Sequence, residues 1–167
     1  MRWLAQIAFV LLGVSIANAN TITLADGRAA GAISGAMITA LKDINQAQKG
    51  IRQGGDFSAN EGCLEHVQSH LMLVQTDVQN LEGLFLLAAQ MTDASDEAAV
   101  LHITDIAVDG FLNADTPLIR GEMNRLSGLC SRFPLPVAKA LQSVELIDKA
   151  VSLAQSVSKR LKSVARP

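Results

Sequence analysis

Residues 63–88 read CLEHVQSHLMLVQTDVQNLEGLFLLA, and this stretch decides the fold of the chain. Its apolar residues recur at alternating steps of three and four, which puts them on one face of an α-helix. Just upstream, Ser58-Ala59-Asn60-Glu61 is a capping box, the pattern of a helix start. The segment therefore predicts a long helix, running to about Thr92, that buries one stripe: Leu64, Val67, Leu71, Val74, Val78, Leu81, Phe85 and Ala88.

Helical stripes of the same kind lie on both sides of this segment. The upstream stripe ends where Gln53-Gly54-Gly55-Asp56 breaks the pattern, and the last helix follows a turn at Phe133-Pro134-Leu135-Pro136. In the first helix the expected inward residues are Ala30, Ile33, Met37, Ala40, Ile44, Ala47 and Ile51. In the last they are Val137, Leu141, Val144, Ile147, Val151, Ala154, Leu161 and Val164.

A third helix is expected from Ser95, because Asp96 and Glu97 would then lie at the positive end of the helix dipole. Thr116-Pro117 should interrupt it, since proline has no amide to donate; Thr116 would cap the restarted helix, with Pro117 at its first position. The inward residues are predicted to be Ala99, Ile103, Ile106 and Ala114, then Ile119, Met123, Leu126 and Cys130. A solvated polar face is expected opposite: His102, Asp105, Asp109 and Asn113.

Four helices of similar length with short connections predict an all-α fold, an antiparallel up-down-up-down four-helix bundle with its third helix interrupted at Pro117. Residues 53–119 hold eleven acidic side chains and no Lys or Arg, whereas residues 120–167 hold nine basic and three acidic ones. The bundle would bring the basic tail, from Lys159 to Arg166, to the end that carries Asp93, Asp96 and Glu97. Gly27, Gly31 and Gly35 recur every four residues, which predicts a closely packed first helix.

The chain begins with the three parts of a secretory signal peptide. Arg2 precedes an apolar run from Trp3 to Ala17, and Ala17-Asn18-Ala19 fits a cleavage site. The run is shorter than the ~20 residues of a membrane-spanning helix. We therefore expect residues 1–19 to be removed, residues 20–167 to form a single domain without a transmembrane segment, and the protein to be periplasmic or extracellular.

Composition argues against several classes of partner. Without Arg2 the mature part has 13 basic and 16 acidic residues, a balance that gives no reason to expect nucleic acid as a partner. The mature part also has no Trp and no Tyr, the side chains on which sugars and single-stranded nucleic acids commonly stack.

The two cysteines, Cys63 and Cys130, are predicted to form a disulfide. An exported chain reaches a compartment where disulfides persist, and no odd cysteine is left over. In an antiparallel pair of helices, Cys63 near the start of the second would lie almost level with Cys130 at the end of the third. The alternative is two buried free thiols that pack as small core residues.

His66 and His70, four residues apart on one helix, are weak candidates for a metal site. No third ligand is evident, and each Glu precedes a His by five residues rather than the three of the di-iron bundle motif. We therefore expect no cofactor and no metal. No nucleophile elbow, phosphate-binding glycine loop or haem attachment motif occurs either, so the sequence predicts no enzyme.

The leading hypothesis for function is an exported, non-enzymatic helical bundle that binds a protein partner or associates with itself. The alternative is a carrier that holds a small hydrophobic molecule between its helices. Residues expected to line such a site are Met37, Met72, Phe85, Met91, Phe111 and Met123. A metal-binding protein using His66 and His70 is the third and weakest hypothesis.

Overall fold

The computed structural model describes residues 21–54, 59–92 and 94–164, and the account below concerns these residues. They contain no strand, so the prediction of an all-α fold is confirmed for this part of the chain. The expected signal peptide and the expected cap at Ser58 lie outside the described residues. Five helical segments are present: α2 (Leu24–Gly54), α3 (Ala59–Ala88), α4 (Ala94–Asn113), α5 (Asp115–Leu129) and α6 (Pro134–Val164).

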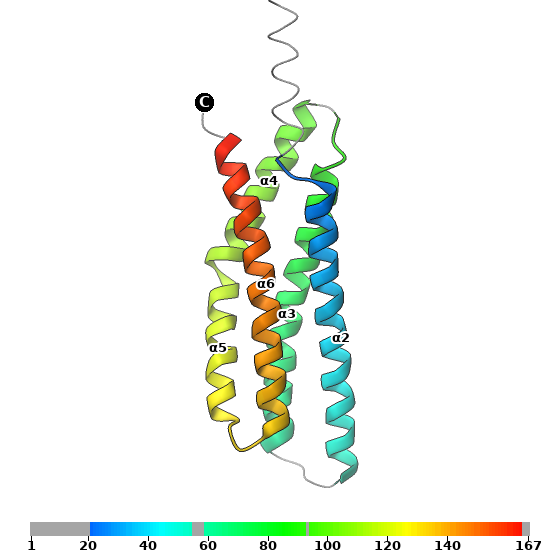
Figure 1. Cartoon of the computed structure of the whole chain (residues 1–167), viewed down its shortest axis with the longest axis vertical. Coiled ribbons are helices and arrows are strands. Elements are labelled where there is room, and N and C mark those ends of the chain that lie inside the picture. The colour runs from blue at the N-terminus through cyan, green and yellow to red at the C-terminus, as the bar shows by residue number, and fades with distance from the viewer. Residues whose placement is uncertain (1–20, 55–58, 93, 165–167) are drawn as a thin grey trace, which may run out of the picture.

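These segments occupy the four positions of a helical bundle, with α4 and α5 together taking the third. In Figure 1, α2 runs from the upper to the lower end and α3 returns beside it. The chain then descends through α4 and α5, and α6 rises to the upper end again. The α6 helix packs against all four of the other helices, and α2 packs most extensively on α3.

The α3 helix supplies the central stripe of the core, as its sequence predicts. All eight stripe residues from Leu64 to Ala88 are buried. Their partners on the other helices include Met37, Ile44, Val108, Met123, Ile147 and Val157, all fully buried. The predicted extension of this helix to Thr92 is wrong, because α3 ends at Ala88 and the amide of Gln90 bonds to the Leu87 carbonyl in a tight turn.

The break in the third helix lies three residues before Pro117. Ala114 is the N-cap of α5, so Asp115 is its first residue and Pro117 its third. The prediction that Thr116 caps α5 is wrong, and its buried hydroxyl has no hydrogen-bond partner in the described structure. Proline is tolerated anywhere in a first turn, where the amides have no intrahelical acceptor, so Pro117 limits the position of the break without specifying it.

The last helix also starts earlier than its sequence predicts. It begins at Pro134 rather than after Pro136, so that both prolines lie in the first turn of α6. The connection from α5 is correspondingly short, with the Phe133 amide bonded to the Cys130 carbonyl at 2.8 Å.

The α4 helix presents a different face to the core from the one that its isoleucines predict. Ile103 and Ile106 are 54% and 59% exposed, whereas Thr104, Val108 and Phe111 are buried. Thr104 is tolerated in the core because its hydroxyl donates to the Val100 carbonyl at 2.7 Å, which satisfies the polar group locally. The helix carries two apolar stripes, and only one can face the bundle.

Close packing of the first helix holds at two of the three expected glycines. A Cβ atom at Gly27 would lie 2.5 Å from Leu86 Cδ2, and one at Gly31 would lie 2.5 Å from Glu82 Oε1. Gly35 has open space around the same position. The upper part of α2 therefore lies close to α3 at Gly27, whereas a side chain at Gly31 would require only the flexible end of Glu82 to move.

Candidate functional site

An exposed apolar stripe lies on α4 and is formed by Ala99, Ile103, Ile106 and Gly110. Steps of four, three and four place these residues on one helix face. All four are exposed, and two are large aliphatic side chains that a bundle helix would ordinarily bury. We refer to these four residues as the α4 stripe.

Acidic and polar side chains flank the α4 stripe. Asp96 lies along one edge, and His102 and Asp109 lie along the other, and all three are exposed. The Asp109 carboxylate accepts a hydrogen bond from the Asn113 side chain at 2.8 Å. The α4 helix contains no Lys or Arg, so it places acidic side chains and no basic aliphatic side chain of its own beside the stripe.

The expected polar face of α4 is therefore only partly as predicted. His102, Asp109 and Asn113 are exposed, but Asp105 is half-buried and its Oδ1 atom is buried without a partner in the described structure. Asp105 is also one of the residues that line a cavity of about 250 Å³ at the upper end of the bundle, together with Thr21, Ala98, Leu101, His102, Leu161 and Val164. We refer to it as the end cavity.

Next to the end cavity, the chain leading into α2 is fixed to α6 by one arginine. Arg160 Nε donates to the Thr21 carbonyl at 3.0 Å, and its Nη2 lies 2.6 Å from Asp26 Oδ1. The other oxygen of Asp26 accepts from the Thr23 amide and hydroxyl, both at 2.8 Å, which caps α2. The sequence predicted Arg160 at the same end as the acids of α4, but its carboxylate partner belongs to α2.

His66 and His70 lie on the outer side of α3. His66 is exposed, and Nδ1 of half-buried His70 bonds to the His66 carbonyl at 2.7 Å. The described residues contain no group of three or more His, Cys, Asp or Glu side chains arranged to hold a metal ion. His70 instead faces α5: the hydrogen bond from Arg125 lowers the pKa of Glu122, and the charge of His70 acts in the same direction.

The six residues expected to line a hydrophobic ligand site are dispersed. Met37, Phe85 and Met123 are fully buried in the core. Met91 is half-buried just beyond α3, and Met72 is 52% exposed on the outer side of α3. Phe111 is buried and also lines a second cavity of about 270 Å³, between α3 and α4, together with Asp77, Asn80, Leu81, Ala107, Gly110 and Ala114.

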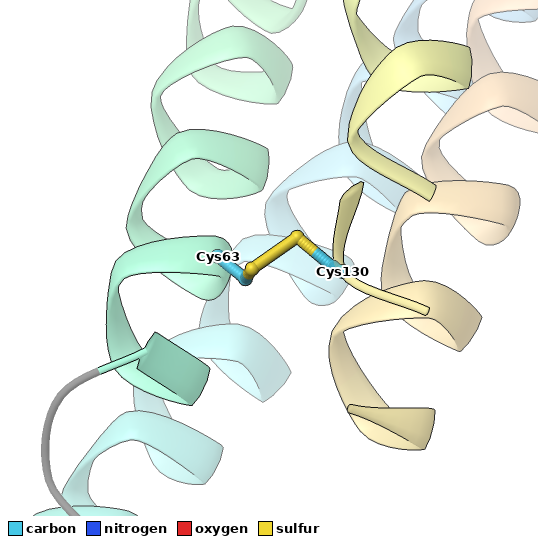
Figure 2. The surroundings of a disulfide bond; sticks show 2 residues. All are labelled: Cys63 and Cys130. Atoms are coloured by element: carbon cyan, nitrogen blue, oxygen red, sulfur yellow. A yellow bond between two sulfur atoms is a disulfide. The ribbon is translucent and has the colours of Figure 1, made fainter. Parts of the chain in front are cut away.

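The cysteines lie at disulfide distance, as the sequence predicts. Their Sγ atoms are 2.19 Å apart and their Cα atoms 6.0 Å apart. Figure 2 shows the bond running from Cys63, in the first turns of α3, to Cys130, at the end of α5. It ties the two helices together at the end of the bundle opposite to the end cavity (Figure 1).

Sequence reasoning missed the end cavity and the Arg160 contacts. For the Arg160 contacts the sequence did contain a signal. Thr23 and Asp26 have the spacing of a capping box and mark the start of α2, where Asp26 pairs with Arg160. No local pattern indicates that Asp105 and Thr21, 84 positions apart, share a cavity. None of the helices in the described ranges has a stretch long and apolar enough to cross a membrane.

Comparisons with models of known families, with curated proteins and with solved structures find no match to this chain.

Proposed function

We propose that this chain is an exported up-down-up-down helical bundle, without catalytic activity, that binds another protein through the α4 stripe. The observation that carries the proposal is the exposure of Ile103 and Ile106 on one face of α4. Full burial of an isoleucine side chain releases about 1.5–3 kcal/mol, and roughly half of that free energy is not gained here because each of the two side chains is more than half exposed. A partner that covers them recovers that free energy.

The charges around the stripe favour a particular kind of partner. An amphipathic helix lays its apolar face into an apolar surface, and basic residues beside that face would meet Asp96 and Asp109. Pairing of two copies about a twofold axis through α4 would place acidic edges against acidic edges, which is unfavourable. We therefore propose a foreign partner with a basic, amphipathic helix, and self-association is the alternative.

Two features support export as part of this proposal. Thr21, two residues beyond the expected cleavage site, is already buried, and its carbonyl accepts a hydrogen bond from Arg160. The cysteine pair is suited to an oxidising compartment, where disulfides persist. Sequencing the N-terminus of the protein from its host tests this part: it should start at Asn20, and a chain that retains Met1 or Trp3 would contradict export with cleavage.

The binding surface can be tested by site-specific photo-crosslinking in the host. A photoreactive amino acid at position 106 should crosslink to another protein, whereas the same group at Leu129, which is 62% exposed on α5, should not. With the crosslinked protein purified, Ile106→Asp should weaken binding at least tenfold, because it removes apolar area and places a carboxylate against the apolar face of the partner. Binding should also weaken as salt is raised.

The possible outcomes separate the hypotheses. A crosslink from position 106 to a second copy of the chain would replace the foreign partner by self-association. Equal crosslinking from positions 106 and 129, or none from either, would contradict a binding role for the α4 stripe.

The carrier hypothesis remains second, and the end cavity is the observation that favours it. Four of its lining residues are apolar, as expected of a small-molecule site. Native mass spectrometry of protein from its host tests it, because a carrier should retain a bound small molecule and a bare chain would count against this function.

A further inference from the structure

The cavity of about 270 Å³ between α3 and α4 lies next to the last residue of the α4 stripe. Gly110 belongs both to the stripe and to the lining of this cavity. Leu81 and Phe111 are buried, so they form the part of the wall that is shielded from solvent. Asn80, Gly110 and Ala114 are exposed and lie where the cavity opens. We refer to it as the α3–α4 pocket.

The polar residues that line the α3–α4 pocket are an acid and an amide, both from α3. Asp77 is half-buried and Asn80 is exposed. No Lys or Arg lines the pocket, and the sequences of α3 and α4 contain none. The field of a carboxylate acts over several ångströms, so the pocket favours an occupant with a positive charge and disfavours an anion.

The rest of the pocket lining is apolar and comes from both helices, with Leu81 on α3 and Ala107 and Phe111 on α4. The volume of about 270 Å³ exceeds the roughly 150 Å³ of an apolar cavity that admits benzene. An aliphatic stem that ends in a cation matches both the apolar and the acidic part. Arginine and lysine side chains have this construction, because they pack their methylene groups on apolar surface while the charged end stays in contact with water.

The face of α3 that contributes to the pocket is apolar on both sides of it. Steps of four, three, four and three place five residues on this face: Leu73, Asp77, Asn80, Leu84 and Leu87. Leu73 and Leu87 are 56% and 44% exposed, and Leu84 is half-buried. Because this face and the α4 stripe both reach the α3–α4 pocket, a helix that covers the stripe would meet apolar side chains from two helices with the pocket among them.

We propose that the α3–α4 pocket receives an arginine or lysine side chain from the partner helix that covers the α4 stripe. The stem would pack on Leu81 and Phe111, and the charged end would lie toward Asp77 and Asn80. The identity of the occupant rests on the proposed function. What is added is the feature that selects the partner, namely a basic residue within its apolar face and not only beside that face.

The chemistry of the pocket is tested without the partner. The probe is butylguanidinium, which has the stem and the charged end of an arginine side chain, and pentanol and pentanoate are the neutral and anionic controls. NMR titration of the isotope-labelled protein follows the methyl signals of Leu81 and Ala107 and the amide signal of Gly110. Butylguanidinium should shift these signals saturably and bind at least about fivefold more tightly than either control.

Two variants alter the pocket, and each has a matched control. Asp77→Asn removes the charge, and Gly110→Leu adds bulk to the wall. A Cβ atom at Gly110 would meet no atom within 4 Å, and the same holds at Gly121 on α5, so Gly121→Leu is the control for Gly110→Leu. Asp109→Asn, an exposed acid outside the pocket lining, is the control for Asp77→Asn.

Both pocket variants should weaken butylguanidinium binding at least about fivefold, since one removes the favourable charge and the other occupies space. Both controls should leave the affinity unchanged. Circular dichroism melting of each variant verifies that the bundle is folded, so that a loss of binding is assigned to the pocket.

The occupant is tested with the protein that a photoreactive group at position 106 crosslinks. The same group in place of Asn80 should crosslink to a segment of that protein that contains Arg or Lys. Asp77→Asn should weaken partner binding at least about fivefold, and so should alanine in place of the partner's basic residue. The two substitutions together should cost little more than either alone, because they act on one contact.

The results separate the pocket from the stripe. Butylguanidinium that binds no better than pentanol, or that binds the parent and the pocket variants equally, would overturn the proposal whether or not a partner covers the α4 stripe. Partner binding that is weakened by Ile106→Asp but not by Asp77→Asn would also overturn it, and would leave the proposed function intact. Selective butylguanidinium binding without any crosslink from position 106 would contradict the proposed function and would overturn the partner helix as the occupant.

Discussion

Arg160 is the residue that joins the two ends of the described chain. It lies on α6 and holds a backbone carbonyl at Thr21 and a carboxylate at Asp26, more than 130 positions away. The Arg160 and Asp26 side chains are 35% and 11% exposed, so this pair is shielded from solvent more than Arg120–Asp148, whose side chains are 51% and 44% exposed. Surface pairs contribute about 0–1 kcal/mol, and a partly buried, hydrogen-bonded pair contributes more.

Arg160→Gln should therefore destabilise the bundle by about 1.5 kcal/mol, since Asp26 loses its charged partner and Thr21 its donor. The measurement is urea unfolding followed by circular dichroism. Lys159→Gln, an exposed neighbour on the same helix, is the matched control and should stay within about 0.5 kcal/mol of the parent. Equal effects of the two substitutions would show that the contacts of Arg160 contribute nothing specific.

At the scale of the element, α2 and α4 show how packing acts on a helix as a unit. Gly27 lets α2 approach α3 where a side chain would collide with Leu86, whereas a side chain at Gly31 would displace only the flexible carboxylate end of Glu82. The α4 helix turns one of its two apolar stripes to the core and leaves the other in solvent.

Alanine substitutions on α2 should have opposite effects at two glycines eight residues apart. Gly27→Ala should lower the unfolding free energy by about 1–3 kcal/mol, because the new methyl group would lie 2.5 Å from Leu86 Cδ2 and only 3.3 Å from the Leu86 backbone nitrogen. Gly35→Ala should raise it by up to about 1 kcal/mol, because alanine is the better helix former and the site has open space. Denaturant unfolding of the two variants, side by side, checks both signs. A gain at Gly27 would refute close packing there.

Substitutions on α4 distinguish its buried stripe from its exposed one. Val108→Ala should cost about 2 kcal/mol, since Val108 is fully buried. Ile106→Ser should change stability by less than about 0.5 kcal/mol, because its side chain is largely in solvent. Thermal unfolding of the monomeric protein is the appropriate measurement. A larger loss for Ile106→Ser than for Val108→Ala would mean that α4 packs with the other face inward.

At the scale of the whole molecule, a different kind of contact joins neighbouring helices at each end of the bundle. The disulfide joins α3 to α5 at one end, and Arg160 joins α6 to the start of α2 at the other. Between them runs a continuous core to which all five helical segments contribute. The end cavity lies beside the Arg160 contacts, and the α4 stripe belongs to a helix that starts at the same end.

Removal of the disulfide in Cys63→Ser/Cys130→Ser should destabilise the bundle by up to about 4 kcal/mol, because the bond closes a loop with a sequence separation of 67 and restricts the unfolded chain. Guanidinium unfolding of the oxidised protein and the double variant gives the difference. Thiol counting on the denatured, unreduced protein provides the independent check: it should find no free thiol, and two per chain would show that the cysteines are not bonded.

Much of the architecture follows from local patterns in the sequence. The α3 stripe is a property of spacing alone, because any helix made from residues 63–88 gathers those apolar side chains on one face. The pairing of Cys63 with Cys130 could be predicted because there are only two cysteines and because helix lengths fix their heights in a bundle. The helical nature of the other segments follows from the same spacing rule.

What required the tertiary structure was the rotation of each helix about its own axis and the contacts that depend on it. The α4 helix has two apolar stripes that are equivalent by sequence, and only packing against α3, α5 and α6 buries Val108 and exposes Ile106. The partner of Arg160 and the position of Thr21 and Asp105 on one cavity likewise depend on how distant helices pack. Local periodicity determines which residues share a face, whereas the direction of that face is decided by the burial available from helices far away in the chain.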